Sequence, residues 1–142
     1  MNVQIRPFAP ADQGALIALW QACELTRPWN DPAKDIRRKL DVDPAGLGVA
    51  VDERGVLVGS VMVGYEGHRG WINYLAVAPQ ARRHGLGRQL MAWAEALLAA
   101  RGCPKVNLQI RSENTAVQAF YAALGYTDDC VMSMGRRLES DL

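Results

Sequence analysis

The residues most suited to chemistry form one short turn, Arg82-Arg83-His84-Gly85-Leu86-Gly87-Arg88, between an apolar run and a helical pattern. The backbone N–H groups at the start of that helix have no partners within it, and they lie at the positive end of its dipole. Gly85 and Gly87 carry no Cβ, so the backbone can come close to a ligand, and the arginines add positive charge. The turn therefore predicts a site for a phosphate-bearing ligand.

Two better-known glycine-rich turns do not fit this stretch. A P-loop needs Gly-Lys followed by Ser or Thr, whereas Arg88-Gln89 follows Gly87. A dinucleotide-binding fingerprint needs a third glycine, and the next position of that pattern is Leu90. The glycines would also suit a helix start that only needs a tight turn, and the turn alone does not decide between a ligand site and that structural role.

The elements around this turn alternate between strand and helix patterns. Apolar spacing and capping residues predict a strand near residues 3–7, a helix after Asp12 and a second helix that opens at Pro32. Two β-rich runs around DERG predict a hairpin, and the apolar GWINYLAVAP predicts a further, central strand. The order is completed by a helix from Leu86 to about Arg101, a strand in CPKVNLQIRSEN, a last helix capped by Asn114 or Thr115, and one or two strands in YTDDCVMSMGRRL.

The length and composition of the chain limit the classes of function that it can have. A chain of 142 residues with 49% hydrophobic residues has the size of one domain, and no linker or repeat divides residues 1–142. A formal net charge of +1 provides no overall field for nucleic acid or an anionic membrane. Three cysteines without a C-x-x-C pair favour free thiols over a metal site, and no apolar run is long enough to span a bilayer. We expect a soluble, cytoplasmic protein whose anion site is local.

The turn, the strand INYLAV before it and the later segment IRSENTAVQAFYAALGY together resemble the GNAT superfamily of N-acetyltransferases. RPWNDP, GYEGHRG, ARGCPK and MGRRL are similar to stretches of a small bacterial branch, the YpeA-like acetyltransferases. The resemblance covers nearly the whole chain. It implies an α+β domain with a central, mostly antiparallel sheet of six to seven strands, a splayed strand pair and about four helices. It also implies that the phosphate belongs to acetyl-CoA, used as a co-substrate without a metal.

The resemblance assigns roles to individual residues. The open edge of the splayed strand would pair with the pantetheine amides, and the N–H of Val77 would polarise the thioester carbonyl. Asn114 would contact the pantetheine arm, although it equally suits a helix cap. Tyr121 would donate a proton to the departing thiolate, whereas its place on the apolar stripe of its helix also suits a core aromatic residue. The implied cofactor-binding residues are Leu75, Ala76, Val77, Arg82, Arg83, His84, Gly85, Leu86, Gly87, Arg88, Asn114 and Tyr121.

Acetyl transfer to an amine also requires a neutral nucleophile. An alkylamine has a pKa near about 10, so only about one molecule in a thousand is free base at neutral pH, and a base or a water chain must remove a proton. In relatives that acetylate protein N-termini, a glutamate stands two residues before the arginine that resembles Arg111. This chain has Gln109 there, which cannot accept a proton. The candidates left for the base, or for orienting a water, are Glu66, His68, Glu113 and Asn73.

The acceptor pocket is expected between the loop TRPWNDP and the hairpin GYEGHRG, although a solvated hairpin tip and an apolar loop plug are equally consistent with those stretches. The candidate substrate-binding residues are Trp29, Asn30, Asp31, Tyr65, Glu66 and His68.

The sequence thus favours an enzyme that transfers the acetyl group of acetyl-CoA to a primary amine of a small molecule or protein in a ternary complex. Tyr121 would be the general acid, and Glu66 is a second candidate catalytic residue. Gln109 leaves open an alternative, a non-catalytic acyl-CoA-binding or regulatory domain with the same fold. The stretch CVMSMGRRL near the end of the chain would suit strand pairing between two chains in a homodimer.

Overall fold

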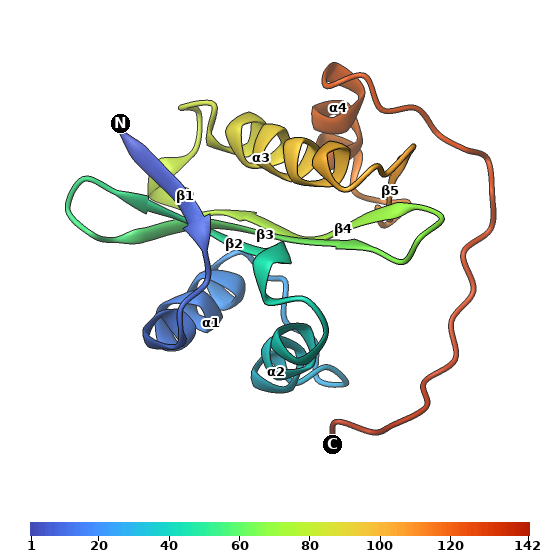
Figure 1. Ribbon diagram of the computed structural model, residues 1–142, viewed down its shortest axis with the longest axis horizontal. Coiled ribbons are helices and arrows are strands. Elements are labelled where there is room, and N and C mark those ends of the chain that lie inside the picture. The colour runs from blue at the N-terminus through green and yellow to red at the C-terminus, as the bar shows by residue number, and fades with distance from the viewer.

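The structure of residues 1–142, a computed structural model, places one sheet between two pairs of helices (Figure 1). In chain order the elements are β1 (Val3–Pro7), α1 (Gln13–Ala22), α2 (Pro32–Val42), β2 (Leu47–Asp52), β3 (Leu57–Tyr65), β4 (Gly70–Val77), α3 (Leu86–Ala100), β5 (Val106–Leu108) and α4 (Thr115–Ala123). Short 3₁₀ turns lie at Pro10–Asp12, Pro44–Gly46 and Pro79–Ala81. α1 and α2 cover one face of the sheet, and α3 and α4 cover the other (Figure 1).

The sheet has five strands in the order β1-β2-β3-β4-β5. The first three pairs are antiparallel, and β4 and β5 are parallel. The predicted α+β class, the mostly antiparallel sheet and the four helices are confirmed. The prediction of six to seven strands was wrong, and β3 rather than β4 occupies the middle of the sheet.

The strands that were predicted near the end of the chain are absent. The closing segment, residues 127–142, contains no strand. Ion pairs between charged side chains, rather than backbone pairing with β5, fix the two ends of this segment. Lys105 Nζ lies 2.9 Å from a carboxylate oxygen of Asp129, and Arg38 Nη2 lies 2.6 Å from Asp141 Oδ1. The segment therefore runs from α4 around the edge of the sheet and ends beside α2 (Figure 1).

Helix boundaries follow from local chemistry. Asp31 caps α2 because its Oδ1 accepts the N–H of Ala33 at 2.9 Å, and Pro32 occupies the first helical position, where no N–H is needed. α3 is amphipathic, and its inner face packs on the sheet through five buried residues, Leu86, Leu90, Met91, Ala94 and Leu98. No helix is both long and apolar enough to cross a lipid bilayer.

β5 pairs over its whole length with the beginning of β4 only. The pairs are Gly70 with Val106, Trp71 with Asn107 and Ile72 with Leu108, after which β4 continues to Val77 alone on that side. The predicted splayed strand pair is therefore present. At the same point β4 bulges, because its pairing with β3 shifts between Ser60 and Met62.

Candidate active site

A cleft opens where β4 and β5 separate. Its volume is about 870 Å³, and both strands, α4 and the region around α2 contribute to its walls. β4 contributes Ile72–Leu75, and the end of β5 with the residues that follow it contributes Leu108–Arg111. The other lining residues are Cys23, Glu24, Leu25, Arg27, Asn30, Asp35, Arg38, Lys39, Val42, Met62, Asn114, Val117 and Tyr121.

Tyr74 forms the bulge of β4 and is fixed on three sides. Its φ of 51° lies in the left-handed region, which is costly for a residue with a Cβ. Its ring stacks on Trp20 with centroids 3.8 Å apart, and its carbonyl accepts the hydroxyl of buried Ser60 at 2.8 Å. Its own hydroxyl donates to Asp35 Oδ2 at 2.6 Å. Burial, with a smaller effect of Asp35, raises the pKa of Tyr74, so this hydroxyl keeps its proton and its bond.

Tyr121 presents a buried ring and an available hydroxyl. The side chain is 7% exposed and packs edge-on against Phe120 and Tyr126, with centroids 5.0 and 5.6 Å away. Every fully buried side-chain nitrogen and oxygen has a hydrogen-bond partner, whereas the Tyr121 hydroxyl has none within the chain, so this hydroxyl is open to the cleft that Tyr121 lines. Burial raises its pKa to about 12, which keeps it a proton donor at neutral pH.

The arginine-glycine turn connects β4 to α3. Arg83 and Gly85 adopt left-handed φ values of 69° and 75°, and Gly85 is the N-cap of α3. No acidic residue lies in the first turn of α3, so the positive end of its dipole is not neutralised. Arg82 lies against the end of β4, because its Nε donates to the Val77 carbonyl at 3.3 Å.

Gly87 has a packing role. A Cβ at this position would lie 3.1 Å from the Phe120 ring, so its absence lets α4 approach α3. The two glycines of the turn thus do different things: Gly85 permits the backbone conformation, and Gly87 permits close contact with the helix that carries Tyr121.

Residues 15–126 match the acetyltransferase (GNAT) family, a range that covers most of the chain and includes every residue that lines the cleft. The chain belongs to the GNAT family. An acetyltransferase of Pectobacterium atrosepticum is 47% identical over 140 residues, which are 98% of each chain. This protein is accordingly an acetyl-CoA-dependent N-acetyltransferase, the activity that the resemblance implied.

Solved structures share the fold. A structure of AAC(6')-Iy in complex with a bisubstrate analogue of CoA and acetylneamine has a TM-score of 0.77 and 20% identity, over 96% of this chain and 99% of the other. A structure of Naa20 of Chaetomium thermophilum in complex with a bisubstrate analogue has a TM-score of 0.70 and 27% identity, over 87% of this chain and 70% of the other. The splayed sheet with its cleft is therefore a GNAT arrangement.

Within this GNAT cleft lie some of the residues expected to bind the cofactor. Leu75, Asn114 and Tyr121 line it, and Asn114 Oδ1 also accepts the Val117 N–H at 3.2 Å as the cap of α4. Val77 lies farther along β4, and Ala76 and Leu86 are almost wholly buried, so only their backbones could meet a ligand. The remaining residues of the turn, Arg82–Arg88, are not part of the cleft wall and lie beyond the end of β4.

The residues expected to bind the acceptor are dispersed. Asn30 lines the cleft, Trp29 is 51% exposed and outside it, and Asp31 is occupied in capping α2. Three others, Tyr65, Glu66 and His68, lie at the β3–β4 hairpin and not in the cleft wall.

Glu66 is already engaged by its own turn. Its carboxylate accepts the backbone N–H groups of Arg69 and His68 at 2.5 and 2.6 Å, and these bonds lower its pKa. A carboxylate held in this way is a weak base. Glu113 also lies outside the cleft wall, whereas Asn73 is part of it.

Two carboxylates that the sequence did not suggest line the cleft, Glu24 and Asp35. Glu24 follows α1 with a φ of 58°, and Asp35 is in the first turn of α2. No local motif marks either residue, because it is the packing of α1 and α2 on the sheet that brings them to β4. The one available signal was the position of Asp35 one turn after the cap Asp31, which places both on the same side of α2.

Proposed function

We propose that this GNAT enzyme transfers the acetyl group of acetyl-CoA to a primary amine of a small molecule or a peptide by direct transfer in a ternary complex. The cleft supports this proposal because β4 lines it from Ile72 to Leu75, two residues before the strand ends ahead of the arginine-glycine turn, and because its wall carries the carboxylates of Glu24 and Asp35. Coenzyme A would lie along β4 with its pyrophosphate on the backbone N–H groups of the turn, and the amine would enter beside Asp35 and Glu24.

The observation that carries the mechanism is the Tyr121 hydroxyl, which is protonated, unpartnered and open to the cleft. The amine nitrogen attacks the thioester carbonyl carbon, an N–C bond forms, and the C–S bond breaks. The sulfur leaves as a thiolate that needs one proton, which the Tyr121 hydroxyl would supply as a general acid.

The proton that the amine must lose is a separate requirement. Glu24 and Asp35 are the carboxylates of the cleft wall, so they are suited to attract an ammonium group. Asp35 already accepts hydrogen bonds from Tyr74 and Arg38, which makes it a binding group rather than a free base. We propose that a water held by Asn73, with Glu24 as its carboxylate partner, removes the proton.

Release of free coenzyme A tests the function. Purified protein is mixed with acetyl-CoA and a panel of an aminoglycoside, polyamines, amino acids and peptides with free N-termini, and thiol formation is followed. Acceptor-dependent release with at least one amine is expected. Binding of acetyl-CoA without turnover on any of them would favour the alternative, a non-catalytic acyl-CoA-binding domain.

Calorimetry tests the cofactor independently of turnover. Acetyl-CoA and desulfo-CoA should bind with similar affinity, since most of their contacts are the same, and ATP should bind more weakly. ATP binding as tight as acetyl-CoA binding would refute the coenzyme A site.

A further inference from the structure

The last residues of the chain dock on α2 through one carboxylate. The Asp141 side chain is fully buried, with 0% exposure, although most of the closing segment is exposed. It accepts from Arg38 Nη2 at 2.6 Å and from the Asp31 backbone N–H at 2.8 Å, and Arg137 lies 3.7 Å away. The Arg38 bond is the main cause of an Asp141 pKa far below its usual range.

The same Arg38 connects the closing segment to the cleft. Its Nη1 lies 3.2 Å from Asp35 Oδ1, and Asp35 Oδ2 accepts the Tyr74 hydroxyl at 2.6 Å. Arg38, Asp35 and Tyr74 all line the cleft. An unbroken series of charged and polar contacts therefore leads from Asp141 to the bulge of β4.

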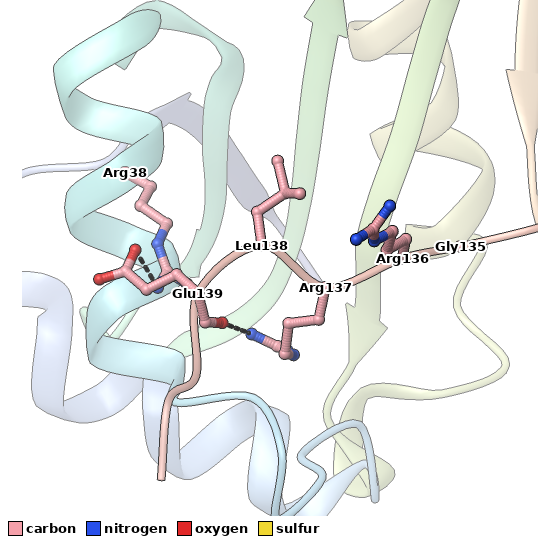
Figure 2. A pocket seen from close by; sticks show the side chains of 6 residues that line it. All are labelled: Arg38, Gly135, Arg136, Arg137, Leu138 and Glu139. Carbon is pink, nitrogen blue, oxygen red and sulfur yellow. Dashed lines mark hydrogen bonds and ion pairs between the residues drawn. The ribbon is translucent and has the colours of Figure 1, made fainter.

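Arg38 also faces a second, smaller space. A cavity of about 500 Å³ lies between α2 and Gly135–Glu139, and Figure 2 shows the Arg38 side chain beside Glu139 at its wall. Glu139 Oε2 lies 3.5 Å from Arg38 Nη2, and the Glu139 side chain is 74% exposed. A pair that is so exposed contributes little, so the buried Asp141 rather than Glu139 sets the position of Arg38.

Tyr74 needs such support. Its left-handed φ is costly, so the bulge persists only while its surroundings hold it. Trp20 and Ser60 hold the ring and the carbonyl, and Asp35 holds the hydroxyl. Asp35 in turn is held by Arg38, whose geometry depends on Asp141.

We propose that Asp141 is a positioning residue for acetyl transfer: through Arg38 and Asp35 it holds Tyr74, and so fixes the bulge from which β4 presents Leu75–Val77 to the pantetheine arm. The proposal rests on the proposed function in placing that arm along β4. The closing segment is then part of the working site, although it contributes no side chain that reaches the reacting atoms.

Asp141→Asn removes the charge while keeping the size of the side chain. We expect kcat/KM to fall about tenfold, because contact networks of this kind transmit roughly 0.5–2 kcal/mol. Glu139→Gln is the matched control, since it removes the exposed carboxylate beside the same Arg38, and it should leave kcat/KM within about twofold.

Ligand binding separates positioning from a general loss of structure. Acetyl-CoA should bind Asp141→Asn several-fold more weakly, whereas adenosine 3′,5′-bisphosphate, which lacks the pantetheine arm, should bind unchanged. A merely destabilised protein would lose both ligands together. This measurement needs no acceptor, so it stands if the proposed amine chemistry fails.

A double-mutant cycle tests whether Asp141 acts on Tyr74 through Arg38 and Asp35. Asp141 and Tyr74 share no hydrogen bond, since the Tyr74 hydroxyl donates to Asp35, so the effects of Asp141→Asn and Tyr74→Phe on kcat/KM should multiply if the two residues act separately. If both act through Asp35, the double variant should be about as slow as the slower single variant. Multiplied effects, or an Asp141→Asn enzyme with wild-type kcat/KM and acetyl-CoA affinity, would overturn the proposal.

Discussion

The two ends of the cleft are built in opposite ways. The end proposed for the cofactor consists of β4, a turn and the start of α3, which follow one another without interruption between Gly70 and Arg88. The end proposed for the acceptor is assembled from remote parts of the chain, so that the Asp31 backbone and the Asp141 side chain meet across 110 positions. A local site can be recognised by its pattern of residues, whereas a site assembled from distant segments depends on the packing of the whole domain.

The same contrast appears in the charges. The arginines of the turn have no acidic neighbour in the first turn of α3, so they remain available to an anion. At the other end the charges of α2 that line the cleft are paired within the protein, as Arg38 is with Asp35 and Asp141, and Lys39 with Asp43. The first end leaves its charges available to an external ligand, whereas the second combines a paired network on α2 with Glu24, Arg27 and Arg111, which line the cleft and form no ion pair within the chain.

Tyr121→Phe should have the largest effect, because it removes the proposed proton donor of the chemical step. Turnover should fall about 10²–10⁴-fold, while the melting temperature and acetyl-CoA affinity change little. Tyr126→Phe is the control: its ring also packs on Tyr121, but its hydroxyl donates to Glu95 at 2.5 Å, and it does not line the cleft. Unchanged turnover in Tyr121→Phe would make Tyr121 a core aromatic residue.

The value of kcat/KM should rise with pH through the neutral range. Burial raises the pKa of Tyr121 to about 12, so the donor is protonated at every pH below that value. The amine gains free base with rising pH, so kcat/KM should increase by about a hundredfold between pH 7 and pH 9 for an acceptor of pKa near 10. A fall between pH 8 and pH 10 that disappears in Tyr121→Phe would show that Tyr121 ionises too early to be the donor.

Gly85→Val should damage cofactor binding. The φ of 75° is strained for a β-branched residue, and reorienting the turn would misalign N–H groups that bind phosphate. We expect the Kd of acetyl-CoA to rise about 10–100-fold, the equivalent of one or two charge-assisted hydrogen bonds.

Gly102→Val provides the matched control for Gly85→Val. Gly102 lies at the other end of α3 with a φ of 80°, and a Cβ at either position meets no atom within 4 Å. The two variants should lose similar stability in thermal unfolding, and only Gly85→Val should weaken acetyl-CoA binding. Equal losses of affinity would mean that the turn has only a structural role.

Substitutions of Asn114 should have the smallest effect, and they separate its role as the cap of α4 from its proposed role in binding acetyl-CoA. Asn114→Asp keeps an oxygen to cap α4 but removes the amide donor, so the melting temperature should hold while acetyl-CoA affinity falls about 2–10-fold. Asn114→Ala should lose affinity and also about 1 kcal/mol of stability, measured by urea unfolding. An Asn114→Asp protein that binds acetyl-CoA normally would leave the residue as a cap alone.

Local patterns in the sequence were sufficient for most of the elements. Pro32, Asn114 and the apolar spacing of α3 predicted three helix starts, because capping and amphipathicity depend on residues within a few positions of one another. The arginine-glycine turn was predicted for the same reason, whereas the splayed strands and the cofactor were implied by the family resemblance. The closing segment was wrongly predicted to contain strands, since strand formation depends on a partner edge that a local pattern cannot supply.

The tertiary structure alone decided which residues share the cleft. Tyr121 had two readings in the sequence, and the packing of its ring with an unpartnered hydroxyl facing the cleft is what supports its proposed role as the acid. Glu24 and Asp35 are ordinary acidic residues in the sequence, and only the docking of α1 and α2 on the sheet brings them to the point where β4 and β5 part. The sequence by itself determined the family, most of the elements and the position of the arginine-glycine turn, because these rest on patterns among near neighbours. The composition of the cleft beside α2 depends on contacts between residues far apart in the chain, whose partners are set by the packing of the whole domain.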